Sequence, residues 1–101
     1  MRIKVLQKAK RDLLAASEFY DSQEQGLGGY FSDVMVSEID ALAWYAGIHV
    51  RYHGYYKAVT RKVPYSIYYK VAGEVVKVYA VLDNRRNPAT IADRVAEYTI
   101  F

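Results

Sequence analysis

The chain has 101 residues, of which 14 are Lys or Arg, 11 are Asp or Glu and none is Cys. This length suffices for one ordinary hydrophobic core, so we expect a single domain over residues 1–101. The lack of cysteine excludes disulfides and thiolate metal sites, and with only two histidines we expect neither a metal nor a cofactor. No apolar run approaches the roughly 20 residues that cross a bilayer, and no signal peptide is evident. We therefore expect a soluble cytoplasmic protein that does not contact membranes.

Charge is unevenly divided along the chain. Residues 12–50 include seven acidic side chains and no Lys or Arg, whereas residues 51–101 carry nine basic side chains against four acidic ones. Such segregation predicts a cationic surface for an acidic partner, either nucleic acid or an acidic polypeptide. An ordinary solvated basic edge would give the same pattern and remains an alternative.

The first half of the chain predicts a strand followed by two helices. Residues 2–6 alternate as a short strand, and apolar side chains then recur at helical spacing in two segments that residues 26–29 separate. The two apolar stripes are Ala9, Leu13, Ala16 and Tyr20, then Phe31, Met35, Ile39, Leu42 and Ala46. Gly47 would end the second helix. Two such helices should form an antiparallel hairpin that lays its apolar stripe on another element.

The second half is rich in Val, Ile and Tyr and predicts three antiparallel strands over residues 56–63, 65–71 and 75–82. In the last two strands we expect one face to pack on the helices; it comprises Tyr65, Ile67, Tyr69, Val71, Val76, Val78, Ala80 and Leu82. The other face should stay amphipathic and open. For the strand over residues 56–63, the pattern does not show which side chains share a face. Residues 87–101 would begin a short helix, with Ile91, Val95 and Tyr98 on one side.

Two motifs at the ends of the predicted strands resemble those of a known family. In residues 56–71 (YKAVTRKVPYSIYYKV), basic residues precede a Pro-Tyr step and a Tyr-Lys strand, and in residues 78–88 (VYAVLDNRRNP) an apolar strand runs into Arg-Arg-Asn-Pro. The helix over residues 9–20 and the GLGGYF step at residues 26–31 agree. The chain is thus similar over nearly its whole length to ParE-like toxins of the RelE/ParE superfamily, type II toxin–antitoxin proteins often described as plasmid stabilisation proteins.

The resemblance implies an α+β fold with an N-terminal strand, a helical hairpin and a three-stranded antiparallel meander, the hairpin packing on one face of the sheet. Two positions depart from the family pattern. Val63 stands where the family often has Phe, and Asp83 stands where many members have His. The second departure removes the side chain best suited to proton transfer near neutral pH.

For function, the resemblance implies a toxin that binds and poisons DNA gyrase and is neutralised by a cognate antitoxin. Cations expected to contact the target or a phosphate are Lys57, Arg61, Lys62, Arg85 and Arg86. The RelE branch cleaves mRNA on the ribosome, which needs an acid and a base besides cations. Because proton-transfer groups are scarce, we assign no catalytic residue and favour binding over catalysis, although enzyme activity stays open. A ribosome-dependent mRNA endoribonuclease and a non-toxic member that only binds antitoxin are the alternatives.

The open sheet face is the expected antitoxin contact, because its mixture of rings and cations suits an acidic, amphipathic segment that folds on binding. The residues expected there are Tyr68, Lys70, Lys77 and Tyr79. Structural roles remain alternatives for the other cations. Arg85 and Arg86 would then pin the turn at Asn87-Pro88, and the lysines and arginine of residues 57–62 would be solvated edge-strand charges that resist aggregation.

Overall fold

The computed structural model describes residues 1–96. Its elements in chain order are β1 (Arg2–Val5), α1 (Gln7–Gln23), α2 (Leu27–Tyr45), β2 (Val50–Tyr52), β3 (Tyr55–Val59), β4 (Tyr65–Ala72), β5 (Val75–Asp83) and α3 (Pro88–Ala96). The predicted position of Tyr98 lies outside the described residues. Within residues 1–96, no helix is both long enough and apolar enough to span a membrane.

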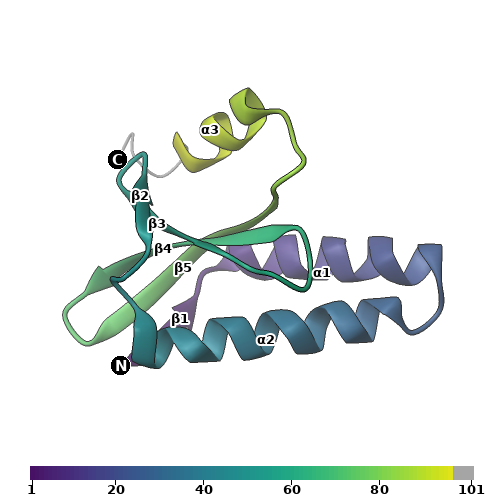
Figure 1. The fold of residues 1–101 in the computed structure, drawn as a ribbon, viewed down its shortest axis with the longest axis horizontal. Coiled ribbons are helices and arrows are strands. Elements are labelled where there is room, and N and C mark those ends of the chain that lie inside the picture. Colours follow the sequence, from purple (N-terminus) through teal and green to yellow (C-terminus); the bar gives the residue numbers. More distant parts are fainter. Residues whose placement is uncertain (97–101) are drawn as a thin grey trace.

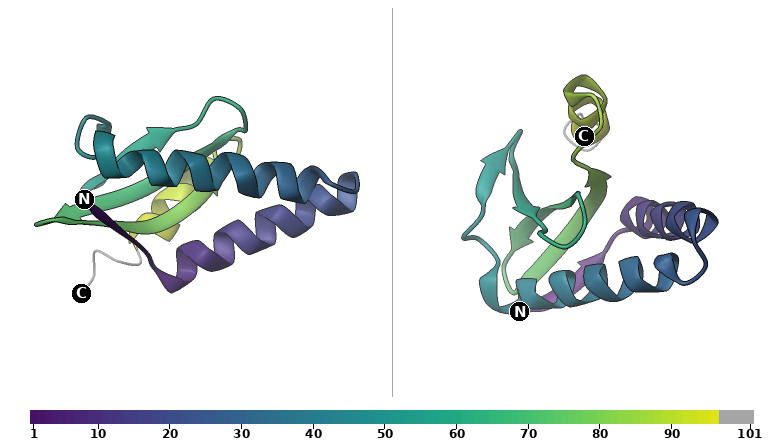
Figure 2. Two further views of the ribbon diagram at one scale, coloured as in Figure 1. Left: turned by 90° about the horizontal axis from the view of Figure 1, so that it is seen from below. Right: turned by 45° about the vertical axis from the view of Figure 1, so that its right-hand side comes forward.

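The strands form one five-stranded sheet in the order β1-β5-β4-β3-β2. β1 runs parallel to β5, and the other neighbours are antiparallel. The hairpin of α1 and α2 covers one face, and α3 lies on the opposite face (Figures 1 and 2). The predicted α+β fold with a helical hairpin on one face of the sheet is therefore confirmed.

Sequence patterning missed β2, which has only three residues. β2 and β3 join through a two-residue turn in which His53 (φ 50) and Gly54 (φ 85) both have left-handed backbone conformations. That conformation gives a hairpin turn the twist of its flanking strands. Three residues are too few to show the alternation by which strands are recognised, so the sequence indicates no strand between the second helix and residue 56.

The two helices of the hairpin approach closely at Gly28, where α2 begins. Asp21 of α1 accepts hydrogen bonds from the backbone N–H groups of Gly26 (2.9 Å) and Gly28 (3.2 Å), and the Ser17 hydroxyl donates to the Gly28 carbonyl (3.0 Å). A Cβ atom at Gly28 would lie 2.5 Å from the Ser17 carbonyl oxygen. Only glycine fits this crossing.

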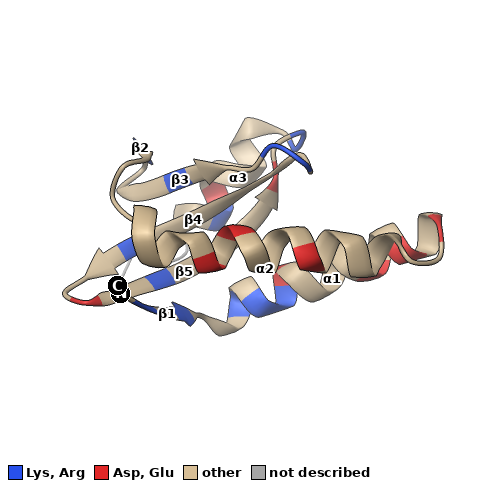
Figure 3. Cartoon of the chain, turned by 60° about the horizontal axis from the view of Figure 1, so that its bottom comes forward, with Lys and Arg blue, Asp and Glu red and all other residues tan. Residues whose placement is uncertain are grey.

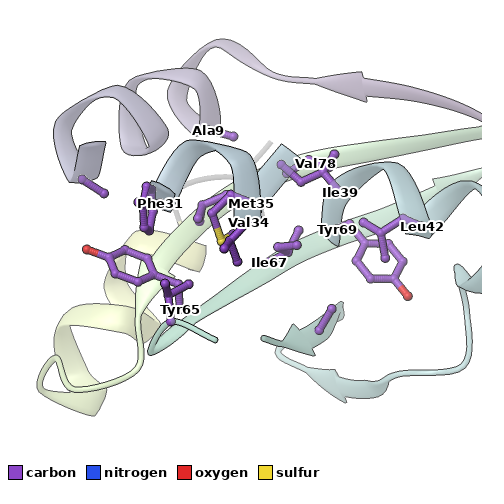
Figure 4. Close-up of a cluster of buried hydrophobic side chains, with 14 of the residues drawn as sticks. Ala9, Phe31, Val34, Met35, Ile39, Leu42, Tyr65, Ile67, Tyr69 and Val78 are labelled. Carbon is purple, nitrogen blue, oxygen red and sulfur yellow. The ribbon is translucent and has the colours of Figure 1, made fainter. Parts of the chain in front are cut away.

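The larger hydrophobic core lies between the hairpin and the sheet. Phe31, Met35 and Ile39 of α2 point toward β4 residues such as Ile67 and Tyr69 (Figure 4). The apolar stripes predicted for both helices supply much of this core, as their helical spacing indicates.

A smaller core lies under α3 on the other face. It contains Tyr55, Tyr68, Ala80, Leu82, Ile91 and Val95. The C-terminal helix and the inward positions of Ile91 and Val95 are as predicted. The expectation that this sheet face is wholly open is wrong, because α3 covers part of it. Tyr68 accordingly has an exposed fraction of 0% instead of facing solvent.

A bulge in β5 explains a second error in the predicted facing. Tyr68 pairs with Ala80 and Tyr69 with Val78, so β5 has one residue more than β4 at this point, Tyr79. One inserted residue reverses the facing of everything beyond it. Ala80 and Leu82, which were expected to face the hairpin, therefore lie under α3, and Val81 faces the hairpin instead.

The uneven charge of the sequence becomes a difference between elements. All charged side chains of α2 are acidic, whereas basic residues lie on the first turns of α1, the sheet and its loops, and α3 (Figure 3).

Candidate functional site

Two loops meet at one end of the sheet. The loop between β3 and β4 (residues 60–64) is tightened by the Thr60 hydroxyl, which lies 2.8 Å from the Val63 carbonyl oxygen. The loop between β5 and α3 (residues 84–87) is tied to it, because the Asn84 N–H donates to the Pro64 carbonyl (2.7 Å). The first loop carries Arg61 and Lys62 and the second carries Arg85 and Arg86, so the four cations lie at the same end of the sheet (Figure 3).

Beside these loops is a groove of about 310 Å³ between α1 and the ends of β4 and β5. Its lining residues are Asp12, Ala15, Ala16, Phe19, Tyr65, Val81, Asp83, Arg85 and Arg86. The two alanines leave space along α1, while Phe19, whose side chain is exposed, adds an apolar wall. The groove is thus amphipathic, with two guanidinium groups along it.

The two arginines differ in their electrostatic state. Arg85 forms a two-point ion pair with Asp83 (Nε–Oδ1 2.9 Å, Nη2–Oδ2 2.7 Å), and its backbone N–H also donates to Oδ1 (2.8 Å). These hydrogen bonds hold the pKa of Asp83 below its ordinary value. Arg86 makes no ion pair within residues 1–96 and is exposed. Arg86 is therefore the cation of this pair that is available to a partner.

Tyr65 lines the groove from β4 and is held by an aromatic cluster. Its ring centroid lies 4.9 Å from that of Phe31 and 6.2 Å from that of Tyr20. Burial, with a smaller effect of the Asp83 carboxylate, raises the pKa of Tyr65 above 10.0. Its hydroxyl therefore stays protonated at neutral pH, which suits a hydrogen-bond donor and not a base.

Asp12 joins three elements at the other side of the groove. β1 ends before it reaches Val81, and the Asp12 carboxylate takes the place of the missing strand by accepting the Val81 N–H (3.0 Å). The same carboxylate binds Arg94 of α3 at two points (2.6 and 2.8 Å). This mostly buried pair links α3 to α1 and β5.

The structure does not bring together all five cations expected at the target contact. Lys57 lies apart from the four loop cations, because its ammonium group is 5.3 Å from the ring centroid of Tyr52 and 5.9 Å from that of Tyr68, on the α3 face. The structure therefore does not place Lys57 beside the loop cations, and its expected contact with the target remains a prediction. The strand carrying it was the one that could not be phased, and its β3 side chains alternate between the two faces.

The four residues expected at the antitoxin contact lie on one face of the sheet, but they differ in exposure. Tyr68 is buried, whereas Lys70, Lys77 and Tyr79 are half-buried. The Lys70 ammonium lies 4.5 Å from the ring centroid of Tyr55 and 5.6 Å from that of Tyr79. Their role in antitoxin binding remains a prediction.

Sequence reasoning missed three residues of the groove. Tyr65 was assigned to the core, where most of its ring does lie. Phe19 gave a usable signal, because it is an apolar residue outside the predicted stripe of its helix. Asp12 gave none, since its partners Val81 and Arg94 are 69 and 82 residues away in sequence.

Neither histidine lines the groove. His49 follows α2, where its Nδ1 contacts the Tyr69 hydroxyl and burial lowers its pKa below 6.5. His53 lies in the turn between β2 and β3. The groove therefore lacks an imidazole for proton transfer.

No family model matches the chain, and no curated protein matches it in sequence. Among solved structures, a chain described as belonging to the chromosomal ParDE TA system from P. aeruginosa is similar, with a TM-score of 0.75 and 19% sequence identity. The similarity covers 82% of this chain and 95% of that one. At this identity it establishes a shared fold, which agrees with the fold that the motifs imply. The chain thus has the fold of a chain from the P. aeruginosa ParDE TA system.

Proposed function

We propose that the chain is the toxin of a type II toxin–antitoxin pair, that it acts in the cytoplasm by binding and poisoning DNA gyrase, and that a cognate antitoxin neutralises it. Two features support this proposal. The fold is that of a chain from a ParDE system, and the two motifs of the ParE-like family lie in the strands and loops that form one end of the sheet.

The observation that favours binding over catalysis is the ion pair between Asp83 and Arg85 at the groove. Cleavage of a phosphodiester needs a group that accepts a proton near neutral pH. Asp83 is held ionised by Arg85 and is a weak base, because its pKa is lowered. The pKa of Tyr65 is raised, so this phenol does not accept a proton either. The groove binds charge but is poorly equipped to move protons.

The target contact consists of the two basic loops. Arg61, Lys62 and Arg86 are exposed, and Arg85 lies beside Arg86 with its position fixed by Asp83. An exposed cationic end of this kind is suited to a partner that carries DNA, since phosphates supply the complementary charge. Lys57 lies on the α3 face, apart from these loops.

A gyrase cleavage assay tests the proposal. Purified protein should stabilise covalent gyrase–DNA complexes and should leave message on translating ribosomes intact. Arg86→Glu should remove the effect on gyrase, because it reverses the charge of the available arginine. Lys10→Glu is the matched control, since Lys10 is an exposed cation on α1 outside the groove. Specific cuts in ribosome-bound message, without trapped gyrase, would instead identify an endoribonuclease.

A further inference from the structure

Three lysines stand next to one another in a row across the sheet. Lys4 of β1 pairs with Lys77 of β5, and Lys77 pairs with Lys70 of β4. Val76 belongs to the core under the hairpin, so Lys77 and its row partners lie on the opposite face. Arg2 is on that face too, two residues before Lys4. We call Lys4, Lys70 and Lys77 the lysine row.

Nothing in residues 1–96 neutralises this row. Neither Arg2 nor any lysine of the row forms an ion pair with a described carboxylate. The ammonium group of Lys70 instead lies over two tyrosine rings. Like charges directly opposite on neighbouring strands destabilise a sheet. A row of three therefore opposes folding, which is expected where a surface serves binding.

The row lies in a part of the sheet face that carries a hollow. A depression of about 360 Å³ is lined by Arg2, Ile3, Lys4, Val75 and Lys77, where β1 and β5 meet. Figure 3 shows the basic residues of β1 and β5 next to each other. The buried residues of α3 pack elsewhere on this face, over Tyr68 and Leu82. The hollow combines three cations with the apolar residues Ile3 and Val75.

The neighbouring strand edge favours a polypeptide occupant. β1 is at the end of the sheet and pairs with β5 alone among the described strands. An extended polypeptide can add to such an edge through its backbone, with its side chains alternating between faces, which a nucleic acid cannot do. Acidic side chains on one side of that segment would then face the row.

We propose that the lysine row and Arg2 dock an extended, acidic polypeptide segment along β1. That this segment belongs to the neutralising antitoxin rests on the proposed function; the docking chemistry rests on the row, the hollow and the position of β1 at the end of the sheet. The surface includes two of the residues that the sequence indicated for antitoxin contact, Lys70 and Lys77, and adds Arg2 and Lys4.

The test measures binding of the full chain to a fluorescent peptide of about sixteen residues with alternating Glu and Val, which presents one acidic side when extended. Lys77→Glu should weaken this binding by about tenfold or more, and Lys10→Glu by less than about twofold. Lys77→Glu should also raise the melting temperature by about 2–5 °C, because it replaces repulsion with attraction to both neighbouring lysines. This gain excludes misfolding as the cause of weaker binding.

Three results would overturn the proposal: no binding of the peptide, equal losses in Lys77→Glu and Lys10→Glu, or tighter, row-dependent binding of an oligothymidylate of the same length. The gyrase assay on the unmodified chain is read separately. Row-dependent peptide binding without trapped gyrase would refute the proposed target and leave the docking surface intact. If gyrase is trapped but peptide binding is insensitive to Lys77→Glu, the docking surface is refuted and the proposed target stands.

Discussion

The ring of Tyr68 stabilises the fold, whereas its hydroxyl destabilises it. The side chain is fully buried under α3, and its hydroxyl has no hydrogen-bond partner within residues 1–96. A buried polar group without a partner costs about 1–3 kcal/mol, whereas the ring fills space that would otherwise be a cavity. Burial, with a smaller effect of Tyr52, raises the pKa of Tyr68 to about 12.

Two substitutions should separate these effects. Tyr68→Phe keeps the ring and removes the hydroxyl, so we expect the free energy of unfolding to rise by about 1 kcal/mol. Tyr68→Ala removes the ring and should lower it by about 3–5 kcal/mol. Urea denaturation measures both changes. Equal losses in the two variants would show that the hydroxyl contributes to stability.

Alkaline pH should weaken the fold through the same residue. The pKa of Tyr68 is about 12 in the folded chain and 10.0 ordinarily, so the folded state holds the phenolic proton more tightly than the unfolded state does. The contribution to stability is complete below pH 10 and is lost as the pH rises from 10 to 12. Tyr68→Phe should show a shallower loss over this range in denaturation experiments. Some loss should persist, because the pKa values of Tyr65 and Tyr69 are also raised. Identical slopes would contradict the assignment to Tyr68.

The roles of some single residues could be predicted from the sequence, and those of others could not. Arg85 and Arg86 stand out because a short motif contains them. The burial of Tyr68 could not be predicted, because it depends on where α3 docks. Strand alternation says which residues share a face but not what covers that face.

At the scale of elements, the helical hairpin depends on the close approach at Gly28. A Cβ atom added at Gly28 would lie 2.5 Å from the Ser17 carbonyl oxygen and 2.9 Å from the Asp21 Cβ, both in α1. Gly29, the next residue of α2, has nothing within 4 Å of the corresponding position. A side chain is therefore excluded at Gly28 and has room at Gly29.

Alanine at each position should therefore have opposite effects. Gly28→Ala forces α1 and α2 apart and should lower the free energy of unfolding by about 1–3 kcal/mol. Gly29→Ala has room and should raise it by about 0.5–1 kcal/mol, because alanine favours the helix. Thermal unfolding of both variants checks the pair, and a stable Gly28→Ala would mean that the helices are not held at this distance.

Elements were predictable where their patterns are long and regular. Both helices of the hairpin and the two long strands show clear periodicity, and their order agrees with the structure. β2 is too short for a pattern, and the bulge at Tyr79 breaks the alternation of β5 without a glycine or proline to mark it. The errors in facing beyond Tyr79 follow from that one inserted residue.

At the scale of the whole molecule, the fold turns charge segregation along the chain into separate surfaces. The basic loops at one end of the sheet and the lysine row on the α3 face are distinct groups of cations, and α2 carries only acidic charges. One surface is proposed for the target and another for the neutralising partner. The charge asymmetry was evident in the sequence, but its division into two surfaces depends on the strand order, which brings β1 beside β5.

Growth on induction tests the central claim most directly. Expression of the chain alone in a bacterial host should slow growth, and co-expression of the antitoxin proposed for it should restore growth. Arg86→Glu should grow normally at the same level of folded protein, and Lys10→Glu should stay toxic. Unimpaired growth with the unmodified chain, at a confirmed high level of folded protein, would contradict the assignment of a toxin.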